Sequence, residues 1–190
     1  MNDTSHLDPE LAEGDDTRNV VDHYKGWKNE SIKADLASKA FVYHIAIENY
    51  QHDFNIGTIV RNANAFNAAG VHIIGKRKWN RRGAMVTDKY LQLYHHESVA
   101  EFAEWARVNN FFITGVDNIE GSQELNKATL EKRTVLVFGQ EGPGLSEELQ
   151  VVCGAIVAIE QFGSTRSVNV GVASGILMRE WVRRWVLTSK

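Results

Sequence analysis

Short apolar runs alternate with segments of helical spacing along most of this chain. Continuous apolar runs are typical of buried strands, and apolar residues three and four positions apart are typical of amphipathic helices. The predicted strands cover residues 41–47, 71–74, 111–116, 135–138 and 155–159. The predicted helices cover residues 30–40, 56–66, 99–108, 125–132, a short segment from Ser146, and about 168–186. This alternation predicts an α/β fold with a mostly parallel sheet flanked by helices.

Polar residues at the helix ends sharpen these boundaries. Asn55 is a natural N-cap for the second helix, and Gly70 is expected to end that helix before the next strand. The hydroxyl of Ser146 can cap the short helix that follows it. The closing helix has a polar face with Arg179 and Arg183. Its predicted apolar face consists of Val172, Ile176, Trp181 and Trp185.

Composition divides the chain into a short acidic start and a mildly basic body. Residues 1–16 hold six of the 24 acidic residues and no Lys or Arg, so the rest carries 21 basic against 18 acidic residues. The net charge of -3 therefore hides a body that is compatible with a polyanionic partner. We expect residues 1–18 to form a flexible tail and residues 19–40 a helical extension. The helix of that extension either packs on the body, covers a site or contacts a partner.

Several protein classes are excluded or disfavoured. No apolar run approaches the roughly 20 residues of a membrane helix, and the acidic start is unlike a signal peptide. Cys153 is the only cysteine, which excludes an internal disulfide and a cysteine zinc cluster. A cytoplasmic protein without a metal is the simplest expectation. His95 and His96 are adjacent, so on a strand they face opposite sides and are expected at the surface or in packing.

One loop concentrates positive charge around a tryptophan. Its basic residues neutralise phosphates, and its indole can stack on an exposed base. A solvated charged loop with a half-buried tryptophan is the alternative. The predicted RNA-binding residues are Lys76, Arg77, Lys78, Trp79, Arg81 and Arg82.

The remaining candidate chemistry lies at strand-to-helix loops, where side chains project above the carboxyl edge of a parallel sheet. The sequence lacks a P-loop, a dinucleotide-binding glycine motif and a nucleophile elbow. Each candidate also has a structural interpretation, because Asn55 and Ser167 can cap helices and Arg61 can pair with an acid such as Glu141. The candidate set is Asn55, Arg61, Glu141, Ser167 and Asn169.

Three segments together resemble the SpoU/TrmH family of RNA ribose 2'-O-methyltransferases, within the trefoil-knotted SPOUT methyltransferases. Residues 55–66 read NIGTIVRNANAF, like the family's N-x-G-x-x-x-R-x-A-x-A-F. Residues 136–145 read LVFGQEGPGL, like a strand followed by G-x-E-x-x-G-[LM]. Residues 167–176 read SVNVGVASGI, with Val168 and Gly171 in place of the commoner Leu and Ser. The resemblance covers about residues 41–187, so residues 41–190 are predicted to be the methyltransferase domain.

The resemblance implies a carboxyl-terminal trefoil knot, a homodimer with a shared site, and S-adenosyl-L-methionine as the cofactor. Backbone at Gly139, Ile159 and Val168 would hold the cofactor, with a contribution from the loop near Thr114 and Gly115. Arg61 would prepare a ribose 2'-hydroxyl of tRNA or rRNA, although a guanidinium stays protonated far above neutral pH.

The other candidate side chains would orient Arg61, the loops and the RNA phosphate. Two alternatives remain: a non-catalytic RNA-binding relative with the same fold, and a Rossmann-like enzyme acting on a small molecule.

Overall fold

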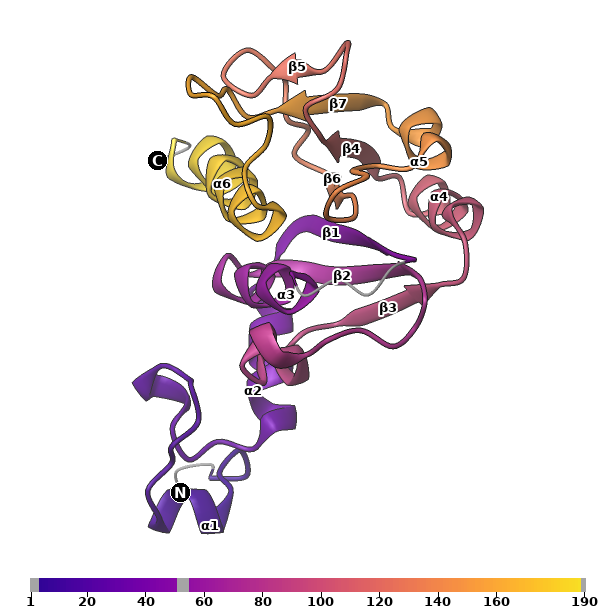
Figure 1. The fold of residues 1–190 in the computed structure, drawn as a ribbon. Coiled ribbons are helices and arrows are strands. Elements are labelled where there is room, and N and C mark those ends of the chain that lie inside the picture. Colours follow the sequence, from indigo (N-terminus) through magenta and orange to yellow (C-terminus); the bar gives the residue numbers. More distant parts are fainter. Residues whose placement is uncertain (1–3, 51–54, 189–190) are drawn as a thin grey trace.

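A seven-stranded, entirely parallel sheet forms the centre of the molecule (Figure 1). The structure is a computed structural model that describes residues 4–50 and 55–188. Residues 1–3 of the predicted tail and residues 51–54 and 189–190 of the predicted domain lie outside the described residues. The strand order is β3-β2-β1-β6-β4-β7-β5. The strands are β1 (Phe41–Asn49), β2 (Ala68–Gly75), β3 (Leu93–His96), β4 (Phe112–Val116), β5 (Gln123–Glu124), β6 (Thr134–Phe138) and β7 (Ala155–Ala158).

Helices cover both faces of the sheet, as the alternating sequence pattern predicts (Figure 1). Helices α3 (Ile56–Ala65) and α6 (Val170–Val182) cover one face. Helices α4 (Val99–Val108) and α5 (Glu147–Val152) cover the other. The remaining helical elements are α1 (Pro9–Glu13), α2 (Asn29–Ser38), the 3-10 turns η1 (Asp22–Tyr24), η2 (Arg82–Ala84) and η3 (Thr87–Tyr90), and the π-helix η4 (Arg183–Leu187).

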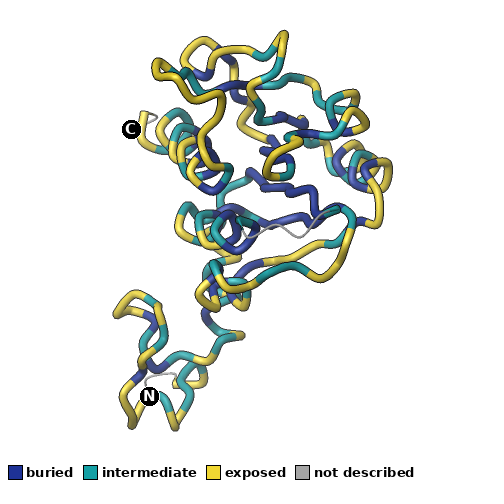
Figure 2. Tube along the Cα trace, viewed as in Figure 1, coloured by how far each residue is buried: buried dark blue, intermediate teal, exposed yellow. Residues whose placement is uncertain are grey.

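Alternate residues of the central strands point into two separate apolar cores. Ile45 of β1 packs with Ile59 and Trp181 on the α3 and α6 side. Val135 of β6 packs with Phe102 on the α4 and α5 side. Because strand side chains alternate between faces, a strand buried on both sides reads as a continuous apolar run. Figure 2 shows that the buried residues concentrate in these strands and the helix faces that contact them.

Residues 4–40 form an arm beside the body (Figures 1 and 2). Its small apolar cluster, with Tyr24 and Ile32, includes Tyr90 of η3, so α2 packs on the body. Residues 4–18, for which the sequence predicts a flexible tail, contain α1 and a buried carboxylate, Asp16. That carboxylate accepts hydrogen bonds from the guanidinium of Arg18, at 2.5 and 2.8 Å, and from the backbone of Gly26. The Arg18 hydrogen bonds hold the pKa of Asp16 well below its usual range. Composition alone does not reveal such a specific pairing.

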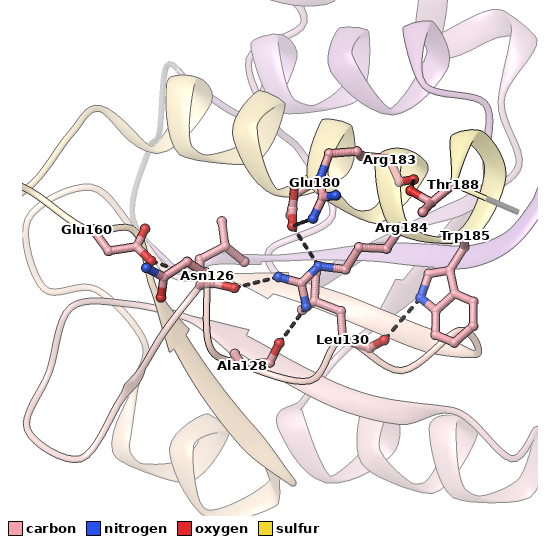
Figure 3. A network of polar contacts seen from close by, with 10 residues as sticks. Asn126, Ala128, Leu130, Glu160, Glu180, Arg183, Arg184, Trp185 and Thr188 are labelled. Atoms are coloured by element: carbon pink, nitrogen blue, oxygen red, sulfur yellow. Dashed lines mark hydrogen bonds and ion pairs between the residues drawn. The ribbon is translucent and has the colours of Figure 1, made fainter.

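The prediction of a helix over residues 125–132 is wrong. This segment is a turn followed by an irregular stretch, and several of its backbone carbonyls accept hydrogen bonds from side chains of the carboxyl-terminal helices (Figure 3). The guanidinium of Arg184 donates to the carbonyls of Leu125 and Ala128, each at 2.5 Å. The indole of Trp185 donates to the carbonyl of Leu130 at 3.0 Å.

Two predicted helix boundaries also need correction. Helix α3 ends at Ala65, because Asn67 adopts the left-handed conformation with φ of 51°. Gly70 lies inside β2, where the rings of Tyr94 and His44 occupy the space that a side chain would need. Helix α6 begins at Val170 and is capped by Asn169, two residues later than the sequence pattern predicts.

Three histidines form a hydrogen-bonded row across β1, β2 and β3 beneath α4. Nδ1 of His44 lies 2.9 Å from Nε2 of His72, and Nδ1 of His72 lies 2.8 Å from Nε2 of His96. All three side chains are buried. Burial lowers the pKa of His44 to about 4 and also lowers the pKa of His96. The row is therefore neutral near pH 7.

Candidate functional site

A cleft opens at the carboxyl ends of β4, β6 and β7. Its volume is about 360 Å³. Parallel α/β sheets commonly bind small ligands at this edge, because the loops that follow the strands converge there. The predicted residues that line the cleft are Gly139, Glu141, Ile159, Ser167, Val168 and Asn169.

A tight glycine turn forms one wall of the cleft. Gln140 and Gly144 exchange two backbone hydrogen bonds of 3.0 Å across the turn. A Cβ at Gly139 would collide with the backbone of Gly144, so this position requires glycine. The conformation of Gly144, with φ of 74°, also favours glycine. The turn therefore presents backbone groups to the cleft at close range.

Three polar side chains from the three sequence motifs form a bridge at the cleft. The amide of Asn55 donates to Oε2 of Glu141 at 2.6 Å, and the amide of Asn169 donates to Oδ1 of Asn55 at 3.0 Å. Oδ1 of Asn169 accepts from the backbone N–H groups of Gly171 and Val172, at 2.9 and 3.3 Å. The bridge thus fixes the glycine turn and the start of α6 to the start of α3.

Arg61 does not line the cleft of its own chain. The residue is exposed on α3. The predicted alternative, an ion pair of Arg61 with Glu141, is not formed, since Glu141 contacts Asn55 instead. Arg61 forms no ion pair among residues 4–50 and 55–188. Ser167 lines the cleft but does not cap α6, because Asn169 has that role.

The loop after β4 contributes residues that the sequence analysis missed. Thr114 and Gly115 are buried within β4, and the cleft is lined instead by the next residues, from Val116 to Asn118. Oδ2 of Asp117 accepts from the backbone N–H of Leu145 at 2.8 Å. The amide of Asn118 donates to the carbonyl of Arg166 at 3.0 Å. No local motif marks these residues, whose contacts are remote in sequence.

Gln161 is a second missed residue with an available hydrogen-bond acceptor. Its side chain lines the cleft, and its Oε1 is buried without a hydrogen-bond partner in the part of the chain that the structure describes. Buried acceptors are normally paired. A ligand with an amino or hydroxyl donor, such as the adenosine part of S-adenosylmethionine, fits a cleft with this acceptor and an exposed glycine backbone.

A shallow groove lies between α3 and α6 on the outside of the molecule. Thr58 and Asn62 of α3 line it with Gly175 of α6. The predicted apolar face of α6 is divided: Trp181 is buried in the core, whereas the side chains of Val172 and Ile176 are 55% and 38% exposed in this groove. An exposed apolar groove of this kind is typical of a protein contact surface.

The predicted RNA-binding residues form the loop after β2, and the last of them, Arg82, begins η2. Asn49, a buried residue at the end of β1, donates to the carbonyls of Lys76 and Lys78 at 2.5 and 2.9 Å. Trp79 is half-buried, and the guanidinium of Arg81 lies 5.5 Å from its ring centroid. The exposed charged residues of this segment are Lys76, Arg77, Lys78, Arg81 and Arg82.

Neither a metal cluster nor a membrane span is found in the described ranges. Among residues 4–50 and 55–188, no group of three or more His, Cys, Asp or Glu side chains could hold a metal ion. The helices within the same residues are too short or too polar to cross a bilayer.

A parallel α/β sheet with a glycine-lined cleft at its carboxyl edge defines a protein that binds a small ligand there. The model of the SpoU rRNA Methylase family matches residues 43–179. The chain therefore belongs to the SpoU rRNA methylase family.

Individual relatives agree with this membership. The chain is 32% identical over 160 residues to an uncharacterized tRNA/rRNA methyltransferase of Mycolicibacterium smegmatis, covering 81% of this chain and 49% of the relative. It is 25% identical over 183 residues to the 23S rRNA (guanosine-2'-O-)-methyltransferase RlmB of Shewanella oneidensis, covering 92% of this chain and 74% of the relative.

A solved structure shares the fold as well. It is an AdoMet-bound rRNA methyltransferase from Sinorhizobium meliloti, with a TM-score of 0.68 and 25% identity, covering 80% of this chain and 60% of that chain.

The chain spans about half the length of the relative from Mycolicibacterium smegmatis.

Proposed function

We propose that this protein transfers the methyl group of S-adenosylmethionine to a ribose 2'-hydroxyl of tRNA or rRNA. The observation that carries the proposal is the bridge of Glu141, Asn55 and Asn169, because it joins the three family motifs at one cleft. Family membership and the activity named for the Shewanella relative support it. A non-catalytic RNA-binding relative with the same fold is the alternative, and a methyl-transfer assay decides between them.

Backbone at Gly139, Ile159 and Val168 would hold the cofactor, and the acceptor Oε1 of Gln161 would receive one of its donors. When bound, the cofactor supplies a methyl group that is already activated by the positive sulfur. The chain's own task is to position the ribose hydroxyl and to assist the loss of its proton. Arg61 has the role of polarising that hydroxyl together with the adjacent RNA phosphate, while Asn55 and Asn169 hold the loops in place.

We also propose that two copies associate through the groove between α3 and α6. Val172 and Ile176 would be covered there, and a two-fold interface presents the same surface from both copies. Arg61, which is exposed on α3 and does not line its own cleft, would then act at the cleft of the partner copy.

The carboxyl-terminal knot implied by the resemblance is part of the same proposal. Its support is a set of hydrogen bonds from the carboxyl-terminal helices. Arg184 and Trp185 of η4 bind the carbonyls of residues 125, 128 and 130 (Figure 3), and Trp181 of α6 binds the carbonyl of Glu131. These contacts hold the carboxyl-terminal helices against the segment that precedes β6.

Methyl transfer is tested by mapping 2'-O-methylated nucleotides in total RNA from cells with and without the protein. We expect at least one site to disappear, and to return on expression of the parent chain but not of Arg61→Ala. Purified Arg61→Ala is expected to bind cofactor normally and to transfer little methyl to RNA. Full turnover by that variant would remove Arg61 from catalysis, and an unchanged methylation map would contradict the proposed function.

A further inference from the structure

Two consecutive residues in the loop after β2 have an unfavourable backbone conformation. Met85 and Val86 lie in the left-handed region, with φ of 48° and 68°. Glycine and asparagine tolerate this region, but a β-branched valine there is a genuine outlier. Such outliers persist only where the surrounding structure enforces them, and they concentrate at functional sites.

Burial of the two side chains does not compensate for this strain. Met85 is 50% exposed and Val86 is 51% exposed. A strained residue that packed into the core would gain apolar contacts in return. Here, about half of each side chain remains in solvent, so the gain from packing is small.

The segment is anchored firmly on both sides of the pair. On one side, the backbone of Gly83 and Ala84 lies against the first turn of α3, so closely that a Cβ at Gly57 would collide with it. On the other side, the buried hydroxyl of Thr87 donates to the carbonyl of Ala84 at 2.6 Å. The backbone that carries these two apolar residues is therefore fixed beside the helix that carries Arg61.

The surroundings of this pair favour an RNA partner. The preceding residues, 76–82, include five exposed cations and no acid. Asp88, the acid that follows, lies 3.4 Å from Arg81. A second copy meeting this surface about a two-fold axis would place like charges opposite each other. Phosphates, in contrast, would be attracted.

Apolar side chains beside cations recognise unpaired nucleotides better than paired ones. In duplex RNA the faces of the bases are stacked on each other, whereas bases in loops and single strands are available for contact. Contacts with base faces depend little on sequence and add to the attraction of the phosphates.

We propose that Met85 and Val86 form an apolar platform for a nucleobase of an unpaired nucleotide, so that the substrate is a loop or single-stranded segment of RNA. This inference rests on the proposed RNA methyl transfer and narrows its substrate class. The platform positions the RNA next to α3, and the basic residues 76–82 hold its phosphates.

Fluorescence anisotropy with a labelled RNA strand, alone and annealed to its complement, tests the platform. The parent is expected to bind the single strand more tightly than the duplex. Val86→Asn suits the left-handed backbone, so its melting temperature should equal or exceed that of the parent. Its affinity for the single strand should nevertheless fall about fivefold or more, because the base contact is lost. Its salt dependence should be unchanged, because the phosphate contacts remain.

Two further variants make the comparison specific. Met85→Leu keeps the apolar surface and should bind the single strand like the parent. Val108→Asn makes the same substitution as Val86→Asn at an exposed valine of α4, on the opposite face of the sheet, and should also bind normally. A general effect of polar substitution would weaken both asparagine variants equally and would overturn the proposal.

The outcomes also separate this proposal from the proposed function. If the parent binds and methylates RNA but Val86→Asn binds the single strand equally well, the platform is wrong and the methyltransferase stands. Equal affinity of the parent for duplex and single-stranded RNA would also contradict the platform and leave the proposed methyl transfer intact. If Val86→Asn loses dimers in sedimentation while its RNA affinity is unchanged, the pair contacts a second copy. Absence of RNA binding by the parent would overturn both proposals.

Discussion

Asn55 shows how one side chain can serve the site instead of its own helix. Asparagine before a helix usually caps it, but the side chain of Asn55 makes no capping hydrogen bond to α3. It links Glu141 to Asn169 instead, across 86 and 114 positions of sequence. The motif marked Asn55 as important, whereas its partners became visible only when three loops were brought together.

Gly139 is the residue at which the geometry of the cleft is most exacting. In Gly139→Ala, the new methyl group would collide with the backbone of Gly144 and displace the turn. We expect the variant to lose S-adenosylmethionine binding in isothermal titration calorimetry. Gly163→Ala is the control, since a Cβ at Gly163 meets no atom within 4 Å, and it should bind like the parent. Unchanged affinity in Gly139→Ala would show that this turn does not hold the cofactor.

At the scale of elements, α6 and η4 stabilise the irregular segment of residues 125–131, for which the sequence pattern predicts a helix. Leu125, Ala128 and Leu130 have helix-like spacing, but their spacing equally allows burial along an irregular stretch. The carbonyls of this stretch accept hydrogen bonds from residues remote in sequence: from Arg184 and Trp185 (Figure 3), and from Trp181. Local periodicity contains no information about such partners, so the helix prediction failed here.

Arg184 and Arg183 offer a matched test of this network. Both bind Glu180, and the hydrogen bonds from Arg183 and then Arg184 lower the pKa of that carboxyl to about 2. Only Arg184 also satisfies the carbonyls of Leu125 and Ala128. Arg184→Ala should lower the free energy of unfolding by about 2 kcal/mol, because these part-buried carbonyls lose their donors. For the exposed pair, Arg183→Ala should cost about 0.5 kcal/mol or less. Equal losses in urea denaturation would contradict the role of the carbonyl contacts.

The histidine row should make stability depend on pH. Burial, and then the charge of Arg133, lower the pKa of His44 from 6.5 to about 4, so the unfolded chain binds protons that the folded chain excludes. The folded state therefore has the full stability contribution of neutral His44 above about pH 6.5, and loses it as the pH falls from 6.5 toward 4. Between about pH 7.5 and about pH 5.5, the loss from His44 alone should be about 1 kcal/mol. Glu101, 4.0 Å from Nδ1 of His96, opposes the effect at the other end of the row.

Urea denaturation at several pH values measures this dependence. His44→Phe retains a ring among Trp105 and Phe111 but removes one titrating group. The variant should therefore lose less stability than the parent between the same pH values, whatever its stability at neutral pH. An identical pH dependence in the two proteins would exclude His44 as a source of it.

At the scale of the whole molecule, Arg61 is exposed on α3 and does not line the cleft of its own chain. This position favours an active site that is shared between two copies. Two inactive variants provide the test: Arg61→Ala, with an intact cleft, and Gly139→Ala, with an intact guanidinium. Co-expressed with different tags and purified as a mixed dimer, they should recover part of the methyl transfer, because one site combines the two intact halves. Each variant expressed alone is the control. A mixed dimer without activity would mean that Arg61 does not act across the interface.

The sequence by itself determined the class of fold and the family. Short apolar runs bounded by turn residues indicate central strands, and glycines and polar residues at strand ends indicate the loops that bind ligands. Those properties are local, so they can be read along the chain. The tertiary structure alone decided which of these residues meet: Asn55 with Glu141 and Asn169, and Arg184 with the carbonyls of residues 125 and 128. Such pairs are far apart in sequence, and only packing around the shared sheet brings them within hydrogen-bonding distance.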